Sequence, residues 1–311
     1  MKKILTIIGP TASGKTSLSI KIARLLDGEI IGLDSRQIYK NMEIGTAQPS
    51  ASELETIPHH LIGFRSPSHS IAAGEYANLV VEKTEEISKR GKVPIICGGA
   101  GLYFRALNFG LFKGSSSDIN IRKKLENAYE KNPNNLFQKL KIIDSKYAKL
   151  VHINNKKRLV RALEIFEITG NTPSENFAIQ KKNRINSLNL FTVFLSWNRE
   201  KLKKRISERT KEMLKNDWIE EVKKLIKKQN YDRSIYPALN SIGYTQIKDY
   251  LSGNLDYQEL EQKSIVKTRQ LSRKQTQWFK KESISLIIEM DNIKARGSSL
   301  IISQIFKVLT N

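Results

Sequence analysis

Two glycines, a lysine and a threonine near the amino terminus have the spacing of a phosphate-binding loop. Gly9, Gly14, Lys15 and Thr16 form a Gly-x-x-x-x-Gly-Lys-Thr pattern between a β-branched apolar run and a helical pattern over residues 17–26. Backbone N–H groups of such a loop point at phosphate oxygens, the lysine supplies positive charge, and the threonine hydroxyl suits Mg2+. The predicted loop consists of Gly9, Pro10, Thr11, Ala12, Ser13, Gly14, Lys15 and Thr16.

An acidic residue closes the next predicted strand, residues 28–34. Asp34 then lies at the carboxyl end of that strand, where open α/β sheets bind ligands, and can serve as a general base, a hydrogen-bond acceptor or a metal ligand. An Asp after a strand is equally typical of a helix N-cap. Ser35, Gln37 and Tyr39 follow closely, and an amide near an aromatic ring favours a nucleobase acceptor.

A second glycine-rich turn, residues 98–101, follows a buried strand predicted at residues 93–97. The glycines around Ala100 indicate either close approach of the backbone to a ligand or a plain tight turn. Further along, Arg205 and Arg209 are four residues apart on a predicted helix. They share a helix face, and a helix that starts over the phosphate loop would let them reach a leaving diphosphate.

The positive charge of the chain is unevenly distributed. The net charge is +22, yet residues 1–112 hold 13 Lys and Arg against 10 Asp and Glu, so +19 lies beyond them. A localised surplus favours a polyanionic partner, and nucleic acid is the one we expect. Solvated lysines in a lysine-rich proteome are the alternative.

Two helical patterns carry much of this charge. Arg158 and Arg161 are three residues apart and share a helix face that suits adjacent RNA phosphates, although a solvated basic face has the same pattern. Residues 263–281 contain seven Lys and Arg and no acid, interleaved with glutamines and aromatic residues. Such a mixture is typical of RNA contact.

Composition excludes several classes of protein. The only cysteine, Cys97, excludes a disulfide framework and a cysteine-built zinc site. The four histidines lack metal-ligand spacing, so no structural zinc is expected, and His59 and His60 are interpreted as structural. No apolar run is long enough to span a bilayer, and the first run enters the glycine loop without a cleavage site. We expect a cytoplasmic protein.

The order of the patterns predicts an α/β fold with a helical insertion. Apolar strands at residues 4–8, 28–34, 93–97, 188–197 and 285–288 alternate with helices such as residues 75–90. The predicted architecture is a P-loop NTPase-like core, residues 1–112 and 188–311, with a mostly parallel sheet flanked by helices. Residues 113–187 form an all-helical insertion. We expect an irregular excursion over residues 41–70, a linker at residues 110–117 and a last helix from about residue 298.

The chain resembles the bacterial tRNA dimethylallyltransferase (IPP transferase) family almost end to end. Specificity comes from the ordered combination, because the phosphate loop alone occurs in many functions. Besides that loop, the matching segments are Asp34–Tyr39, Gly45–Thr46, Pro58–Leu61, Gly98–Tyr103, Arg161–Glu164, Trp218–Val222, Ile242–Tyr244, Thr268–Leu271, Gln275 and Trp278–Phe279.

The resemblance implies a reaction and its participants. The phosphate loop would bind dimethylallyl diphosphate, and the dimethylallyl group would pass to N6 of adenosine 37 in tRNAs that read codons beginning with U, releasing diphosphate. Mg2+ held with Thr16 would be the cofactor, the anticodon stem-loop the partner, and the protein a monomer. Catalytic roles fall to Asp34 as the hydrogen-bond acceptor or general base at N6, to Thr16, and to Arg209 with Arg205. The implied tRNA contacts are Asp34, Ser35, Arg36, Gln37, Ala100, Arg122, Arg158, Arg161, Arg269, Gln270 and Arg273.

Three features depart from the family pattern. Ala100 stands where the family usually has Thr, and residues 152–155 read His-Ile-Asn-Asn instead of His-Pro-Asn-Asp. The linker after Gly110 also lacks the prolines common in the family. None of these changes affects Lys15, Thr16 or Asp34.

Three other functions compete with this hypothesis. A small-metabolite kinase would bind Mg-ATP but have no use for the basic surplus. A prenyltransferase acting on free adenylate would share the core motifs without needing a basic helical insertion. An RNA-binding protein with a degenerate loop would not need Lys15, Thr16 and Asp34 intact.

Overall fold

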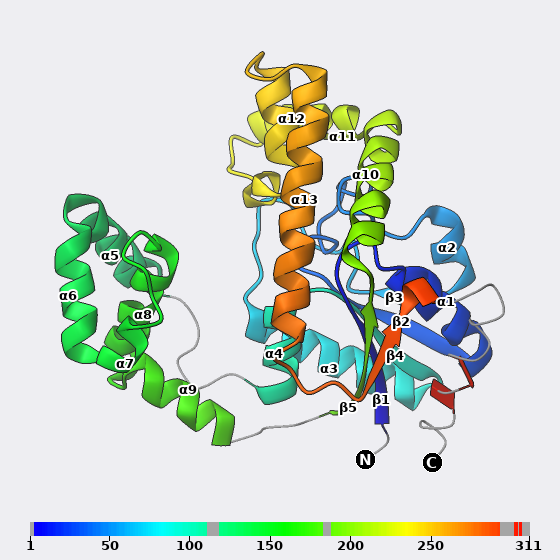
Figure 1. Ribbon diagram of the computed structural model, residues 1–311, viewed down its shortest axis with the longest axis horizontal. Coiled ribbons are helices and arrows are strands. Elements are labelled where there is room, and N and C mark those ends of the chain that lie inside the picture. Colours follow the sequence, from blue (N-terminus) through cyan, green and yellow to red (C-terminus); the bar gives the residue numbers. More distant parts are fainter. Residues whose placement is uncertain (1–2, 111–117, 183–187, 293–301, 304, 307–311) are drawn as a thin grey trace. The chain divides into compact units, whose positions relative to one another are not determined.

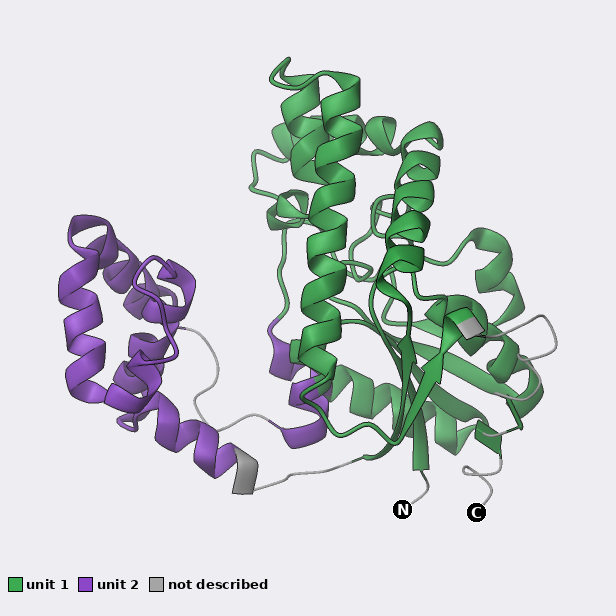
Figure 2. Cartoon of the chain, in the orientation of Figure 1, with its two compact units in different colours: residues 1–71, 78–104, 188–311 green, residues 72–77, 105–187 purple. Residues whose placement is uncertain are grey.

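The computed structural model describes residues 3–110, 118–182, 188–292, 302–303 and 305–306. The chain divides into two compact units, which are coloured separately in Figure 2. Residues 1–71, 78–104 and 188–311 make an α/β unit, and residues 72–77 and 105–187 make a helical unit. Within the described part of the chain, no helix combines the length and hydropathy needed to cross a bilayer.

A six-stranded sheet forms the centre of the α/β unit (Figure 1). Its strand order is β3-β2-β4-β1-β5-β6, and the pairs formed among the described residues are parallel. The central strands are apolar runs because helices cover both faces of a parallel sheet. The predicted P-loop-type α/β fold is therefore confirmed. The strands are β1 Lys3–Ile8, β2 Gly28–Leu33, β3 His59–His60, β4 Val93–Gly98, β5 Asn189–Ser196 and β6 Leu286–Glu289.

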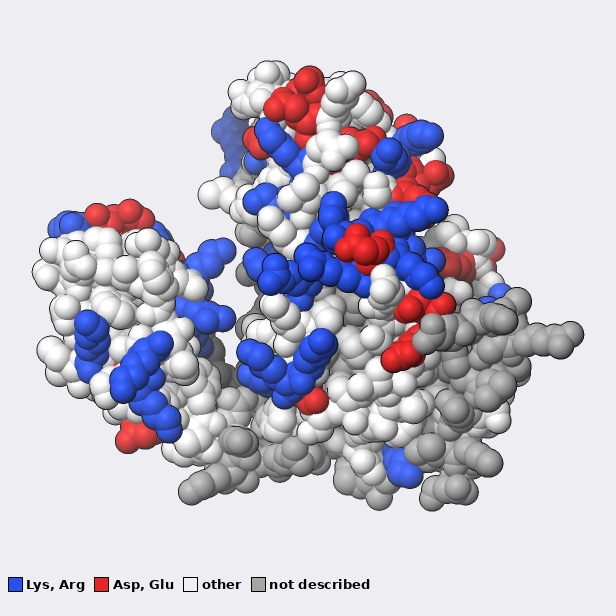
Figure 3. All heavy atoms as spheres, in the orientation of Figure 1, with Lys and Arg blue, Asp and Glu red and all other residues white. Residues whose placement is uncertain are grey.

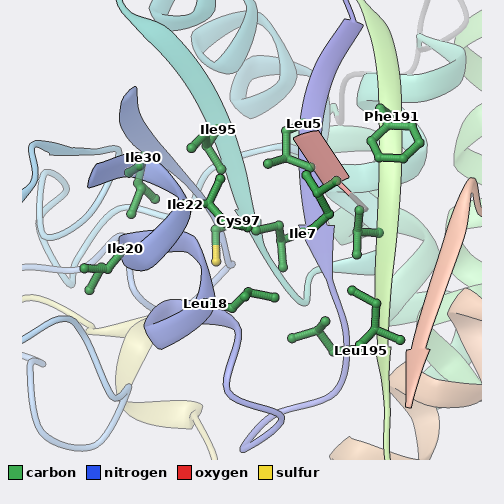
Figure 4. Close-up of a cluster of buried hydrophobic side chains, with 14 of the residues drawn as sticks. Leu5, Ile7, Leu18, Ile20, Ile22, Ile30, Ile95, Cys97, Phe191 and Leu195 are labelled. Carbon is green, nitrogen blue, oxygen red and sulfur yellow. The ribbon is translucent and has the colours of Figure 1, made fainter. Parts of the chain in front are cut away.

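Apolar side chains on one face of the sheet hold α1 in place. One cluster joins α1 to the central strands, and Figure 4 shows Leu18 and Ile22 of α1 among Ile7, Ile95 and Leu195 of the sheet. Each fully buried aliphatic side chain contributes about 1.5–3 kcal/mol, so this packing anchors the start of α1 beneath the glycine loop. The helices that include residues of this unit are α1 Lys15–Leu26, α2 Ala51–Thr56, α3 Ala73–Lys89, α4 Gly101–Phe109, α10 Arg199–Lys215, α11 Trp218–Tyr231, α12 Tyr244–Leu251 and α13 Tyr257–Phe279.

The helical unit has its own apolar core. Leu140, Leu159 and Leu163 are completely buried in it, and side-chain caps fix where the helices begin. Asp118 caps α5, Asn132 caps α6, Asp144 caps α7 and Asn155 caps α8. The expectation of a helical insertion at residues 113–187 is confirmed for its described part, residues 118–182. Its helices are α5 Ile119–Lys131, α6 Pro133–Ile143, α7 Ser145–Ala148, α8 Lys156–Thr169 and α9 Pro173–Lys182.

One expectation about the α/β unit was wrong. Residues 41–70 are not irregular throughout, because they contain α2 and the short edge strand β3. Ser50 and Glu53 form a reciprocal capping box that starts α2, a local signal present in the sequence as Ser-x-x-Glu. The predicted linker beyond Gly110 and the start of the last helix, residues 298–301, lie outside the described residues.

Candidate active site

Three loops meet at the carboxyl edge of the sheet because their strands are neighbours. In the parallel register, Gly98 of β4 pairs with Ile8 of β1 on one side and with Leu33 of β2 on the other. The glycine loop, the second glycine turn and Asp34 follow directly after these three residues. The predicted phosphate loop and acidic residue are thus brought together at the position where open α/β sheets bind ligands.

The glycine loop adopts the wrapped conformation that a phosphate cradle requires. Ala12 and Gly14 both have left-handed backbone conformations, with φ of 64° and 88°. The Lys15 ammonium donates a hydrogen bond to the Pro10 carbonyl (2.8 Å), which keeps it inside the loop. Trp197, just after β5, donates its indole N–H to the Ser13 carbonyl (3.0 Å). The loop is therefore held from within and from the next strand.

Both arginines predicted on α10 contact the glycine loop. Asn198 caps α10 next to the end of β5, and the i, i+4 spacing then aims two guanidinium groups at the loop. Arg205 donates to the Ala12 carbonyl (2.9 Å) and stacks over the Trp197 ring at 4.6 Å. Arg209 donates to the Thr11 hydroxyl. Two positive charges besides Lys15 thus border the loop.

The charges at this edge influence one another. Burial lowers the pKa of Lys15 to about 8, with Cys97 and Asp34 acting in the opposite direction. Burial also lowers the pKa of Arg209, partly offset by Asp34. Confined positive charges with lowered pKa values are stabilised by an anion, because the anion supplies the opposite charge that burial withholds. The site is electrostatically prepared for phosphate.

Asp34 starts a tight turn and keeps one oxygen available. Its Oδ1 accepts the backbone N–H of Arg36 (2.7 Å) and, more weakly, that of Gln37 (3.4 Å). In the described part of the chain, these bonds leave Oδ2 without a hydrogen-bond partner. Asp34 therefore caps a tight turn, not the helix that one interpretation predicted, and it retains an oxygen that can take a proton.

Two side chains, Gln37 and a glutamate on α11, hold the loop at residues 44–47. The Gln37 amide donates to the Thr46 and Ala47 carbonyls (3.2 and 2.6 Å), so it ties the Asp34 turn to this loop. The buried Glu221 carboxylate accepts the N–H groups of residues 44 and 45 (2.7 and 3.0 Å) and the Tyr244 hydroxyl (2.7 Å). Burial raises the pKa of Glu221. The predicted base-reading amide of Gln37 thus has a positioning contact in this structure.

Side chains from the end of α13 pack closely against the second glycine turn. A Cβ at Gly101 would lie 2.4 Å from the Trp278 ring, and a Cβ at Gly99 would lie 2.6 Å from the Gln275 amide nitrogen. Both contacts come from the end of α13. The glycines thus admit side chains of this helix, whereas the sequence left open a ligand or a plain turn. Ala100 lies half-buried in the turn, and its N–H donates to the Leu33 carbonyl (3.1 Å).

In the helical unit, a buried glutamate brings two predicted tRNA contacts together. The Glu164 carboxylate, completely buried, accepts from Arg122 and from Arg161, both at 2.8 Å. Arg158 is exposed one turn earlier on α8, and Asn155 accepts its backbone N–H (3.3 Å). Asn155 therefore caps α8, so the Asn that stands in place of the Asp expected from the resemblance leaves the helix cap intact.

The predicted RNA contacts of the α/β unit lie on α13, in the Asp34 turn and in the second glycine turn. Gln270 and Arg273 are exposed on this helix and Arg269 is partly exposed, while Arg36 is exposed beside Asp34. Figure 3 shows Lys and Arg side chains gathered over α13 and α10 on one face. Ser35 is half-buried in the Asp34 turn.

The sequence did not predict the positioning contacts of three residues, Gln275, Glu164 and Glu221. Gln275 was grouped with the RNA-contacting segment, yet its side chain bonds to the glycine loops. The glutamates stood in family motifs, and each is an acid on an apolar helix stripe. Glu221 shares its buried stripe with Trp218, Val222 and Leu225. That pattern is the signal that could have found it.

The fold and this edge of the sheet define a P-loop α/β protein with a loop prepared for phosphate. The chain belongs to the IPP transferase family, whose pattern matches residues 37–282. It is 37% identical to a tRNA dimethylallyltransferase of Hydrogenovibrio crunogenus over 93% of this chain and 89% of that one. It is 40% identical to the enzyme of the same name from Acetivibrio thermocellus, covering 90% of each.

Solved structures give the same family. A tRNA isopentenylpyrophosphate transferase from Bacillus halodurans superimposes with a TM-score of 0.71 at 33% identity, covering 100% of this chain and 97% of that one. A eukaryotic dimethylallyltransferase acting on tRNA superimposes with a TM-score of 0.83 at 26% identity, covering 99% of this chain and 80% of that one. The family resemblance predicted from the sequence motifs is confirmed.

Proposed function

We propose that this protein transfers the dimethylallyl group of dimethylallyl diphosphate to N6 of adenosine 37 in tRNAs that read codons beginning with U. The observation that carries the proposal is the meeting of Lys15, Arg209 and Asp34 at one sheet edge. Positive groups with lowered pKa values suit a diphosphate, and a carboxylate beside them suits an amine that must lose a proton. Membership of the IPP transferase family supports the same assignment.

The proposed reaction is a substitution at the allylic carbon. The bond from this carbon to the diphosphate oxygen breaks, and the oxygen keeps the electron pair. The adenine N6 forms the new bond to carbon and gives its proton to the Asp34 carboxylate. Lys15, Arg209 and Arg205 stabilise the charge that grows on the leaving diphosphate, because they already surround the loop.

The residues at the loop fit a Mg2+ ion bound with the diphosphate. Among the described residues, no group of three or more His, Cys, Asp and Glu side chains could hold a metal ion by itself. Mg2+ is commonly held by one or two protein oxygens together with substrate phosphates. Thr16, half-buried in the first turn of α1, would supply such an oxygen. The ion would neutralise charge on the diphosphate.

The tRNA is proposed to bind through two sets of residues, each of which contains arginines. Arg122, Arg158 and Arg161 would contact it from the helical unit. Arg36, Arg269, Gln270 and Arg273, with Ser35, Gln37 and Ala100, would contact it from the α/β unit. The target adenine must leave its stack to reach Asp34, as in other enzymes that react on a base. We further propose that the protein acts as a cytoplasmic monomer.

A competition among acceptors tests this function. The protein is incubated with labelled dimethylallyl diphosphate, Mg2+, bulk tRNA, AMP and ATP, and each acceptor is then analysed for label. We expect label on tRNA. Label on AMP alone would assign the enzyme to free nucleotides, and phosphate transfer from ATP to a small acceptor would assign it to the kinases.

A further inference from the structure

Gln275 joins the two glycine-rich loops of the site. It lies near the end of α13, and its carboxamide oxygen accepts the backbone N–H of Thr11 (2.8 Å). Its carboxamide nitrogen donates to the Gly99 carbonyl (3.0 Å). One bond needs an acceptor and the other a donor, so only one orientation of the amide satisfies both. A single side chain thus bridges the phosphate loop and the second glycine turn.

The bridged residue Thr11 also receives the arginine of α10. The Thr11 hydroxyl accepts a hydrogen bond from Arg209, and the Thr11 backbone N–H donates one to the Gln275 side-chain oxygen. The position of the Thr11 backbone therefore sets where the Arg209 guanidinium lies. The two hydrogen bonds of Gln275 go to backbone groups and not to Arg209. Its influence on the position of this positive charge therefore passes through Thr11.

The end of α13 is anchored independently of this carboxamide. Phe279 is completely buried and meets Phe104 and Phe194, with ring centroids 5.7 and 6.1 Å apart. Trp278 packs against Gly101 in the second glycine turn. Because these apolar contacts hold the helix, loss of the two hydrogen bonds should release the loop without displacing α13.

We propose that Gln275 is a positioning residue that holds the glycine loop, and through Thr11 the Arg209 guanidinium, in the arrangement that binds diphosphate. This inference rests on the proposed function, in which the loop binds the diphosphate of the prenyl donor. It differs from the role first expected for this segment, which was direct contact with RNA. Gln275 thereby couples the helix that carries Arg269, Gln270 and Arg273 to the phosphate loop.

The test compares diphosphate binding by the full chain and by Gln275→Met, which keeps the side-chain length but lacks both hydrogen bonds. Dissociation constants are measured with inorganic diphosphate and with dimethylallyl diphosphate, in the presence of Mg2+ and without RNA. We expect binding to weaken about tenfold for both ligands, with tRNA affinity unchanged and the melting temperature lowered by at most about 5 °C. Gln277→Met, an exposed glutamine on the same helix, is the matched control and should bind normally.

A double-mutant cycle separates positioning from general support of the fold. Thr11→Val removes the hydroxyl that Arg209 contacts but keeps the N–H that Gln275 contacts. If Gln275 acts through Thr11 and Arg209, the double variant binds diphosphate more tightly than the product of the two single effects predicts. Additive effects, unchanged diphosphate binding in Gln275→Met, or an equal loss of tRNA affinity would each overturn the inference.

The same measurements keep this inference distinct from the proposed function. Diphosphate binding that depends on Gln275, in a protein that transfers no prenyl group to tRNA, would support the inference and reject the function. Transfer to tRNA that is insensitive to Gln275 at subsaturating dimethylallyl diphosphate would do the reverse.

Discussion

Asp34 and Lys15 divide the proposed chemistry between two charges of opposite sign. Asp34 lies at the end of β2 with one carboxylate oxygen committed to its own turn. Lys15 lies inside the neighbouring loop, where burial lowers its pKa. Asp34 is suited to take the proton from adenine N6, and Lys15 is suited to stabilise the negative charge of the leaving diphosphate. Each role leads to a separate measurement.

Asp34→Asn should fold and bind both substrates but transfer slowly. The Asn side-chain oxygen can still accept the N–H of Arg36, so the turn is retained. The amide cannot take a proton from adenine N6, and kcat should fall by a factor of about 100 to 10,000. Single-turnover transfer at saturating substrates measures the change, with melting temperature as the control. Transfer at the normal rate would remove Asp34 from the role of base.

The affinity for dimethylallyl diphosphate should fall as pH rises through about 8. The bound diphosphate favours the ammonium form of Lys15 and so raises its pKa above that in the free protein. The affinity is therefore highest below pH about 8. Above that pH it declines by up to about tenfold per pH unit, until the pH reaches the pKa of Lys15 in the complex. Binding is measured above the last ionisation of the diphosphate itself.

Lys15→Arg provides the control for this pH dependence, because its guanidinium stays charged throughout. Its affinity, though lower, should not change with pH in this range. A flat profile in the unmodified protein, or the same slope in Lys15→Arg, would contradict the assignment of the transition to Lys15.

At the scale of elements, the site depends on helices that arrive from distant parts of the sequence. Helix α10 brings Arg205 and Arg209 to the loop, α13 brings Gln275, and α11 brings Glu221. The strand ends determine which loops meet, and these helices determine how the loops are held. Side chains far away in sequence therefore fix the conformations of the short loops at the sheet edge.

Glu221→Gln should destabilise the protein through the loop at residues 44 and 45. The glutamine nitrogen would face one of the two backbone N–H groups and leave it buried without an acceptor. The free energy of unfolding should fall by about 1–3 kcal/mol, as measured by chemical denaturation. Glu220→Gln, the exposed neighbour paired with Lys223, should change it by less than about 0.5 kcal/mol. Equal stability of the two variants would show that the buried carboxylate does not hold this loop.

Local patterns predicted the elements, whereas contacts between distant elements had to be seen. The strand, glycine loop and helix around Lys15 follow from periodicity and spacing, and so does the helical nature of residues 118–182. The helix α2 was missed although its capping box is local. That Gly99 and Gly101 admit Gln275 and Trp278 depends on packing across more than 170 residues of sequence. No local pattern carries that information.

At the scale of the whole molecule, the distribution of charge agrees with the proposed partner. Of the net charge of +22, +19 lies beyond residue 112. Basic side chains gather over α10 and α13, and the helical unit holds Arg122 and Arg161 on one buried carboxylate. A small prenyl donor would not need this surplus, but an RNA would, because its phosphates are neutralised by Lys and Arg.

Locating the modified nucleotide tests the central claim most directly. A tRNA that reads codons beginning with U is incubated with the protein, Mg2+ and dimethylallyl diphosphate, digested with nuclease and analysed by mass spectrometry. The account predicts one added five-carbon unit on adenosine 37 and none on the same tRNA carrying inosine there, which lacks the N6 amine. Modification elsewhere in the tRNA, or equal modification of the inosine-containing tRNA, would contradict it.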